Sequence, residues 1–168
     1  DNTRSRGLGD VYKRQDQYCA EVSVAGLIVL QNGTVVYERY GLGNDQTTRW
    51  ASWSVAKSIT SLLVGAAVHD GYIESIDEKV TAYLPRLKDS AYEGATIRNL
   101  LHMASGVEWN EDYVDPQSDV NSVPWGTLPL QRYLRSRGAA AEPGTVFNYN
   151  TAETNLVGTL LRAAIGNN

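Results

Sequence analysis

The sequence has little of what several classes of protein require. Its single cysteine, Cys19, cannot form a disulfide within the chain, and its two histidines share no ligand spacing with it. No metal site is therefore predicted. The longest apolar stretches, residues 25–30 and 62–68, are far shorter than the roughly 18 residues that a membrane span needs. No membrane span is predicted, and the sequence indicates neither a localisation nor an oligomeric state.

Basic charge is also scarce. The net charge is −4, and the eleven arginines are scattered along the chain instead of forming one basic stripe. The electrostatic signature of nucleic-acid binding is therefore missing, and no nucleic-acid partner is predicted. What is present is ordinary: 168 residues, of which 42% are hydrophobic and 20% charged, which is typical of one globular domain.

The first fifteen residues differ from the rest of the chain. They hold four basic and two acidic side chains, few apolar ones and no periodicity. Residues 7–15 resemble a peptide that arises when sequencing-adapter DNA is translated at the end of an assembled read. We interpret residues 1–15 as an artefactual or disordered leader and exclude them from the fold. Residues 16–168 are then expected to form an incomplete domain.

The remaining pattern is one hairpin followed by helices. Residues 22–30 and 34–40 are rich in β-branched side chains and flank Asn32-Gly33, the dipeptide that favours a type I′ turn. Residues 54–69 place apolar side chains at helical spacing, which predicts a long and mostly buried helix. Further helices are expected over residues 75–84, 97–103, 128–137 and 151–165. The expected fold class is α+β. A lone hairpin is only marginally stable, so its sheet needs further strands. No later segment has a strand pattern, and we therefore expect the strands that complete the sheet to be absent from this sequence.

Ser54 and Lys57 form the strongest candidate site. Positions i and i+3 at the start of a helix lie on one face, so a hydroxyl and an amine come within reach of each other. An apolar wall, here Trp50, Trp53 and Leu62, would lower the pKa of the amine and make it a base. The same two residues are also compatible with a helix cap and an exposed lysine, and the spacing alone does not decide between these interpretations.

Four segments in order carry a family resemblance. Residues 53–58 (WSVAKS) resemble the active-site serine motif of the serine β-lactamase-like hydrolases, the group with class C β-lactamases, penicillin-binding-protein-like esterases and 6-aminohexanoate-dimer hydrolases. Three later segments resemble the same family in the same order, and they are residues 73–85, 96–106 and 143–149. The resemblance implies a β-lactamase/transpeptidase-like fold, of which this chain holds the N-terminal hairpin and the helical domain.

The resemblance also implies roles for particular residues. Ser54 would be the acylated nucleophile, Lys57 its base partner and Tyr149 the second proton-transfer group. The family's second motif is usually Tyr-x-Asn, whereas this sequence has Thr151 at the third position, and a hydroxyl offers fewer hydrogen bonds than an amide. Tyr113, from the segment 109–113, is a candidate substrate contact.

Trp53 and Thr151 complete the predicted substrate-binding set with Tyr113. The expected substrate is a small-molecule ester, amide or lactam, and the reaction needs no metal or other cofactor. The family's third motif, Lys-Thr-Gly or His-x-Gly on a late strand, is absent, and His69-Asp70-Gly71 has the letters but lies at a helix end. That strand also supplies one oxyanion N–H, so the chain as given is expected to be inactive.

Other functions remain open. A non-hydrolytic penicillin-binding or sensor module on the same scaffold is the main alternative, because Thr151 departs from the family motif. A Ser-His-Asp site would need His102, which we expect to be a partly buried structural residue. Paired carboxylates for glycoside chemistry would need Glu108, Glu111 and Asp112, which are more typical of a solvated loop.

Overall fold

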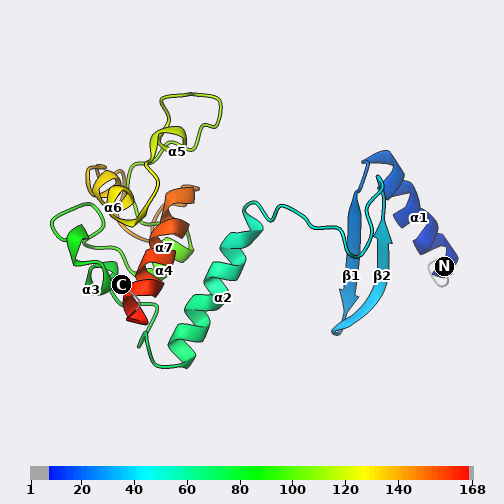
Figure 1. Cartoon of the computed structure of the whole chain (residues 1–168), viewed down its shortest axis with the longest axis horizontal. Coiled ribbons are helices and arrows are strands. Elements are labelled where there is room, and N and C mark those ends of the chain that lie inside the picture. The colour runs from blue at the N-terminus through cyan, green and yellow to red at the C-terminus, as the bar shows by residue number, and fades with distance from the viewer. Residues whose placement is uncertain (1–7, 167–168) are drawn as a thin grey trace, which may run out of the picture. The chain divides into compact units, whose positions relative to one another are not determined.

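A computed structural model describes residues 8–166, and these divide into two units. The N-terminal unit extends to Ala51 and contains the only strands of the described residues, and the helical unit begins at Ser52. Figure 1 shows their elements in chain order. Each unit is described by itself.

The hairpin of the N-terminal unit is the predicted one. Strand β1 (Gly26–Gln31) pairs antiparallel with strand β2 (Thr34–Tyr40). Asn32 and Gly33 between them have φ values of 51° and 76°, the two positive angles that their dipeptide favours. The first strand begins four residues later than expected, and a register shift follows Val29.

Helix α1 (Leu8–Glu21) was not expected. It begins inside the segment that was excluded on sequence grounds, so residues 8–15 are helical in this structure. Asp16 of this helix accepts hydrogen bonds from Tyr37 and Arg39 of strand β2, which join the helix to the hairpin. The interpretation of residues 1–15 as a leader stays a prediction, and residues 1–7 lie outside the described part of the chain.

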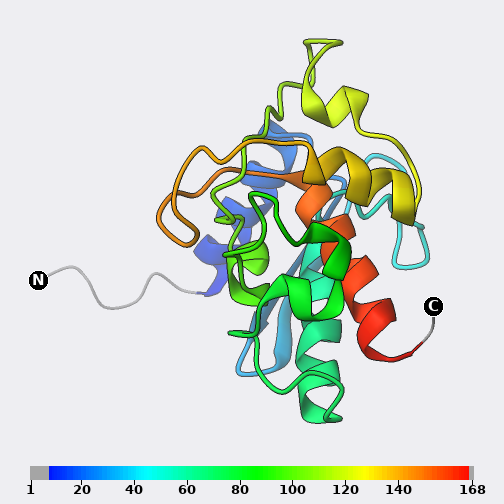
Figure 2. The ribbon, with the colours of Figure 1, turned by 90° about the vertical axis from the view of Figure 1, so that its left-hand side faces the viewer.

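The helical unit is built around its last helix. Helix α7 contacts four other helices, and Figure 2 shows it in red beside the teal helix α2. Apolar side chains of these helices form the core, with Leu156 and Leu160 of α7 fully buried among them. The elements of this unit are α2 (Val55–His69), α3 (Val80–Tyr83), the 3₁₀ helix η1 (Pro85–Leu87), α4 (Ile97–Leu101), α5 (Asp119–Ser122), α6 (Thr127–Arg135) and α7 (Thr151–Ala164).

Helix α2 has the expected length but not the expected burial. Only Val64 and Ala67 of its residues are buried, where the helix packs against α7. Ile59, Leu62 and Leu63 are more than half exposed, so the prediction of a mostly buried helix was wrong. Apolar residues at helical spacing indicate that a helix can be buried. Whether it is buried depends on other elements that pack against it, which the helix's own sequence does not show.

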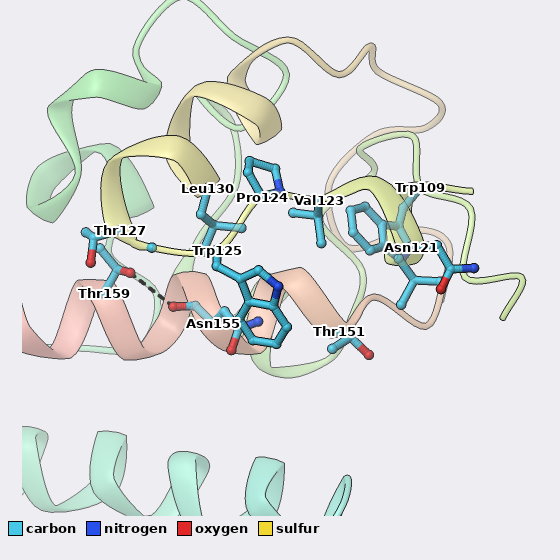
Figure 3. A pocket seen from close by; sticks show the side chains of 12 residues that line it. Trp109, Asn121, Val123, Pro124, Trp125, Thr127, Leu130, Thr151, Asn155 and Thr159 are labelled. Carbon is cyan, nitrogen blue, oxygen red and sulfur yellow. Dashed lines mark hydrogen bonds between the residues drawn. The ribbon is translucent and has the colours of Figure 1, made fainter. Parts of the chain in front are cut away.

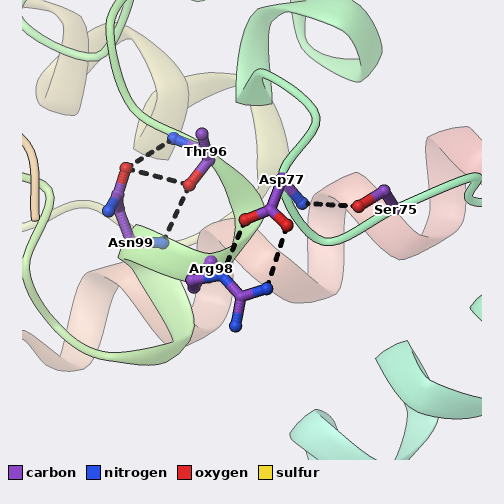
Figure 4. Close-up of polar contacts among 5 residues, drawn as sticks. All are labelled: Ser75, Asp77, Thr96, Arg98 and Asn99. Atoms are coloured by element: carbon purple, nitrogen blue, oxygen red, sulfur yellow. Dashed lines mark hydrogen bonds and ion pairs between the residues drawn. The ribbon is translucent and has the colours of Figure 1, made fainter.

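The contacts around helix α4 give a structural reason for Thr96, Arg98 and Asn99 in the segment 96–106. Thr96 caps the helix by accepting from the Asn99 backbone N–H, and the Asn99 side chain accepts in return from the Thr96 backbone N–H. Arg98 forms a two-pronged ion pair with Asp77, at 2.6 and 2.9 Å (Figure 4). These contacts fasten α4 to the segment that precedes α3.

Gly106 fixes the chain just after this helix. Its φ is +79°, and a Cβ there would lie 2.1 Å from the carbonyl oxygen of Ala141. The Gly106 carbonyl in turn accepts from the backbone N–H groups of Ala140 and Ala141. Only glycine permits this close approach, which brings the segment before Tyr149 alongside the end of α4.

No helix among residues 8–166 combines the length and the apolar character that crossing a membrane would require.

Candidate active site

The two halves of the Ser-x-x-Lys motif meet at the start of helix α2. Ser54 is the N-cap residue, but its side chain makes no capping hydrogen bond, so its hydroxyl is available to other partners. The Lys57 Nζ donates to Ser54 Oγ at 2.9 Å, one helical turn away. Trp53, directly before them, has the uncommon φ of +43°.

Tyr149 joins this pair from a distant part of the sequence. It precedes Asn150, whose side chain caps helix α7 by accepting from the Glu153 backbone N–H. The Tyr149 hydroxyl donates to Ser54 Oγ at 2.7 Å, and Lys57 Nζ lies 5.1 Å from the centre of its ring. The three predicted catalytic side chains therefore share one hydrogen-bonded cluster.

The cluster perturbs the phenol of Tyr149. Its hydrogen bond with Ser54 lowers the pKa of Tyr149, and the hydrogen bond and positive charge of Lys57 lower it further. Both effects stabilise the phenolate form against the neutral phenol. The neutral Tyr149 hydroxyl donates to Ser54, and once it is deprotonated its phenolate can accept the Ser54 proton instead.

The expected apolar wall around Lys57 is absent. Trp53 and Leu62, which lie in the same unit as Lys57, are 86% and 69% exposed, so they do not remove Lys57 from water. The prediction was wrong because these residues are close to Lys57 in sequence but do not enclose its amine. The groups that contact the amine are instead Ser54 and the ring of Tyr149.

A cavity of about 570 Å³ opens beside the cluster, and all of its lining residues belong to the helical unit. Ser54 and Lys57 line it, together with all three predicted substrate-binding residues, Trp53, Tyr113 and Thr151. Trp53 and Tyr113 are largely exposed, whereas Thr151 is half-buried at the start of α7. The structure brings these residues together, and their roles remain predictions.

A second cavity of about 540 Å³ adjoins the first (Figure 3). The two share Thr151, Asn155 and Trp125, and the second is lined mainly by apolar side chains such as Val123 and Leu130. This cavity was not predicted from the sequence. Its lining residues come from three separate segments, which no local pattern connects.

Glu111 is the residue that sequence reasoning underestimated. Instead of lying in a solvated loop, it is half-buried and accepts hydrogen bonds from Trp109 Nε1, the Tyr113 hydroxyl, and both the backbone N–H and the hydroxyl of Thr151. Its position between two aromatic residues was the available signal.

His102, expected to be partly buried, is exposed.

The matches with known proteins cover the same region. The model of the Beta-lactamase family matches residues 15–167, which is most of the chain. The chain belongs to the beta-lactamase family. A 6-aminohexanoate-dimer hydrolase of Paenarthrobacter ureafaciens is 31% identical to this family member over 172 residues, covering 95% of the chain and 42% of the relative.

Solved structures of the beta-lactamase family show the same fold. A class C β-lactamase in complex with cefoxitin matches with a TM-score of 0.67 at 23% identity, over 93% of this chain and 44% of the other. A Bacteroides dorei protein named as a candidate β-lactamase matches with a TM-score of 0.73 at 22% identity, over 96% and 47%. The chain thus has the β-lactamase/transpeptidase-like fold and spans less than half the length of these relatives.

Proposed function

We propose that the protein is a serine hydrolase that cleaves an ester, amide or lactam through an acyl-enzyme at Ser54. The observation that carries the proposal is the cluster in which Ser54 Oγ lies 2.9 Å from Lys57 Nζ and 2.7 Å from the Tyr149 hydroxyl. A nucleophile in contact with a cation and with a phenol of lowered pKa is an arrangement that supports acyl transfer.

The proposed reaction has two steps. When Tyr149 is deprotonated, a form that the positive charge of Lys57 favours, its phenolate takes up the Ser54 hydroxyl proton while Ser54 Oγ bonds to the substrate carbonyl carbon. The tetrahedral intermediate then collapses, the bond to the leaving group breaks, and the leaving alcohol or amine takes up that proton. Water attacks the acyl-enzyme with the same residues as proton carriers, releasing the acid and restoring Ser54.

The activity is proposed for the protein expressed from its complete reading frame, because the hairpin is the only sheet among the described residues. The resemblance assigns the third motif and one oxyanion N–H to later strands. Loss of one such donor lowers the rate by about 10²- to 10³-fold. We therefore expect residues 1–168 alone to show little or no turnover.

Labelling with a fluorophosphonate probe tests the nucleophile. We expect the probe to label the protein, and Ser54→Ala to lose both the label and esterase turnover, whereas Ser58→Ala keeps the label. Lys57→Ala is expected to slow acylation by about 10²- to 10⁴-fold, with Lys88→Ala as its control. Unchanged turnover in Ser54→Ala would refute the proposal. An acylation rate within threefold of wild type in Lys57→Ala would show that Lys57 does not assist the proton transfer.

A non-hydrolytic sensor is the second candidate, because Thr151 replaces the usual asparagine of the second motif. The two functions differ in the fate of the acyl-enzyme. A hydrolase shows a burst and then steady release of product, whereas a sensor keeps a stable covalent adduct on Ser54 that intact-mass spectrometry detects.

A further inference from the structure

Four polar side chains lie inside the core of the helical unit, at the start of helix α7. They are Tyr92, Ser105, Asn150 and Glu153, and none of them is more than 3% exposed. Tyr92 precedes helix α4 in the sequence, Ser105 follows it, and the other two belong to the beginning of α7. Buried polar groups are normally hydrogen-bonded, so the contacts among these side chains determine how each is oriented.

The hydrogen bonds among them have a definite direction. The Asn150 carbonyl oxygen accepts from the Glu153 backbone N–H at 3.1 Å, so the NH₂ end of the Asn150 amide is left for Tyr92. Burial raises the pKa of Tyr92, whereas its hydrogen bond with Asn150 opposes this rise, as expected of a donor to the phenol oxygen. The Tyr92 hydroxyl donates in turn to Glu153 Oε1, at 3.5 Å. The chain of hydrogen bonds therefore begins at Asn150 and ends on Glu153.

Glu153 is an unfavourable residue for stability at this position. Burial raises the pKa of its carboxyl group to about 7, and its Oε2 atom has no hydrogen-bond partner in the described part of the chain. An apolar side chain would avoid this cost. The carboxyl group therefore contributes something other than stability, and its Oε1 atom is the acceptor on which the chain from Asn150 ends.

The other end of this chain lies next to the candidate active site. Asn150 directly follows Tyr149, and its side chain is held at one end by the backbone of α7 and at the other by Tyr92. The Tyr149 hydroxyl reaches Ser54 Oγ, on a different helix, at 2.7 Å. This contact depends on the backbone position of Tyr149, and a misplacement of about 1 Å in an active site can lower a rate by about 10²-fold.

We propose that Glu153 is a positioning residue for Tyr149. By accepting from Tyr92, its Oε1 atom orients the Asn150 amide, and Asn150 then holds the adjacent Tyr149 against Ser54. This inference rests on the proposed function, and it concerns the acceptor oxygen at position 153 and not its charge. A carboxylate, a carboxylic acid protonated at Oε2 and a glutamine amide all offer this oxygen, whereas leucine does not.

Two variants that both lack a titratable group at position 153 test the acceptor. Glu153→Gln keeps an oxygen to which Tyr92 can donate. The double variant Tyr92→Phe/Glu153→Leu removes both partners, so that no buried hydroxyl is left without an acceptor. The value of kcat/KM for p-nitrophenyl acetate is measured against pH in the protein expressed from its complete reading frame. We expect kcat/KM to be about tenfold lower in the double variant than in Glu153→Gln.

The pH profile separates displacement of Tyr149 from damage to the fold. In the proposed mechanism Tyr149 acts once it is deprotonated, and contacts with Ser54 and Lys57 lower its pKa. A displaced Tyr149 loses these contacts, so the rising limb of kcat/KM should lie at higher pH in the double variant than in Glu153→Gln. A smaller fraction of folded protein would lower kcat/KM at every pH and leave the limb in place.

Two single variants complete the comparison. Tyr92→Phe breaks the same chain with Glu153 in place, and we expect it to move the limb as the double variant does. The test therefore does not depend on whether the double variant folds. Tyr83→Phe removes a hydrogen bond from a tyrosine hydroxyl to Glu78, away from the cavity beside Ser54, and the limb should keep its wild-type position.

The outcomes distinguish a failure of the positioning role from a failure of the hydrolase assignment. If turnover depends on Ser54 and the double variant has the same kcat/KM and the same limb as Glu153→Gln, Glu153 does not position Tyr149 and the hydrolase assignment stands. An equal loss in both variants would also overturn the positioning role, because the acceptor oxygen would then have no effect. If Ser54→Ala cleaves the ester at the wild-type rate, the proposed function itself fails.

Discussion

Glu153 is a buried carboxyl group in the first turn of helix α7, and its replacement by glutamine should stabilise the protein at neutral pH. Burial raises the pKa of Glu153 to about 7, although hydrogen bonds with Ser105 and Tyr92 partly oppose the effect. Among residues 8–166, its Oε2 atom meets no hydrogen-bond partner, so an ionised form would leave a negative charge poorly compensated.

The raised pKa makes stability depend on pH in a definite direction. Between its ordinary value of 4.5 and about 7, the folded state keeps the Glu153 proton while the unfolded state releases it. The free energy of unfolding therefore falls as the pH rises through this window and changes little, through this group, outside it. At about 1.4 kcal/mol for each pH unit, the loss amounts to about 3 kcal/mol.

Glu153→Gln removes the titration and keeps the shape of the side chain. We expect its unfolding free energy, relative to wild type, to rise by about 3 kcal/mol between pH 4.5 and pH 8. Urea denaturation monitored by circular dichroism at 222 nm measures both proteins across this range. Glu142→Gln, at an exposed position, is the matched control. If the curves of wild type and Glu153→Gln against pH are parallel, the reasoning about Glu153 is wrong.

Two further predictions concern the segment that supports the cluster. Thr96→Ala should lower the unfolding free energy by about 1 kcal/mol, because the helix cap is lost. Thr96→Ser keeps a capping hydroxyl and should keep most of the unfolding free energy. Equal stability of wild type and both variants in urea would contradict this prediction. Gly106→Ala should lower the unfolding free energy by about 3 kcal/mol, because its Cβ overlaps the Ala141 carbonyl. We expect this loss to appear as a lower melting temperature. Unchanged melting of Gly106→Ala would show that the two segments separate easily.

The parts of the fold that depend on local chemistry could be predicted from the sequence. Asn32-Gly33 determines its own backbone angles, and helix α7 begins at the expected residue and ends one residue earlier than expected. Helix α5 was missed because its four residues are too few to show a period. Helix α1 was missed because residues 1–15 had been excluded from the fold. The exposure of helix α2 could not be predicted from its own residues, because it depends on which other elements pack against it.

The same division applies to the candidate site. Ser54 and Lys57 are one helical turn apart, so spacing alone predicts their contact. Tyr149 lies 95 residues from Ser54, and only the family resemblance suggested that they meet. Glu111 was underestimated because an acidic residue in a loop is usually solvated, whereas its donors come from two segments that fold together.

The backbone of Trp53 sets stability against the proposed function. A left-handed conformation costs a residue with a side chain about 1 kcal/mol or more, and glycine would adopt it freely. Protein engineers who seek greater heat resistance would select Trp53→Gly for this reason. The same substitution would remove an indole from the wall of the cavity beside Ser54. Under the proposed function, a more heat-resistant variant obtained in this way would be a poorer catalyst.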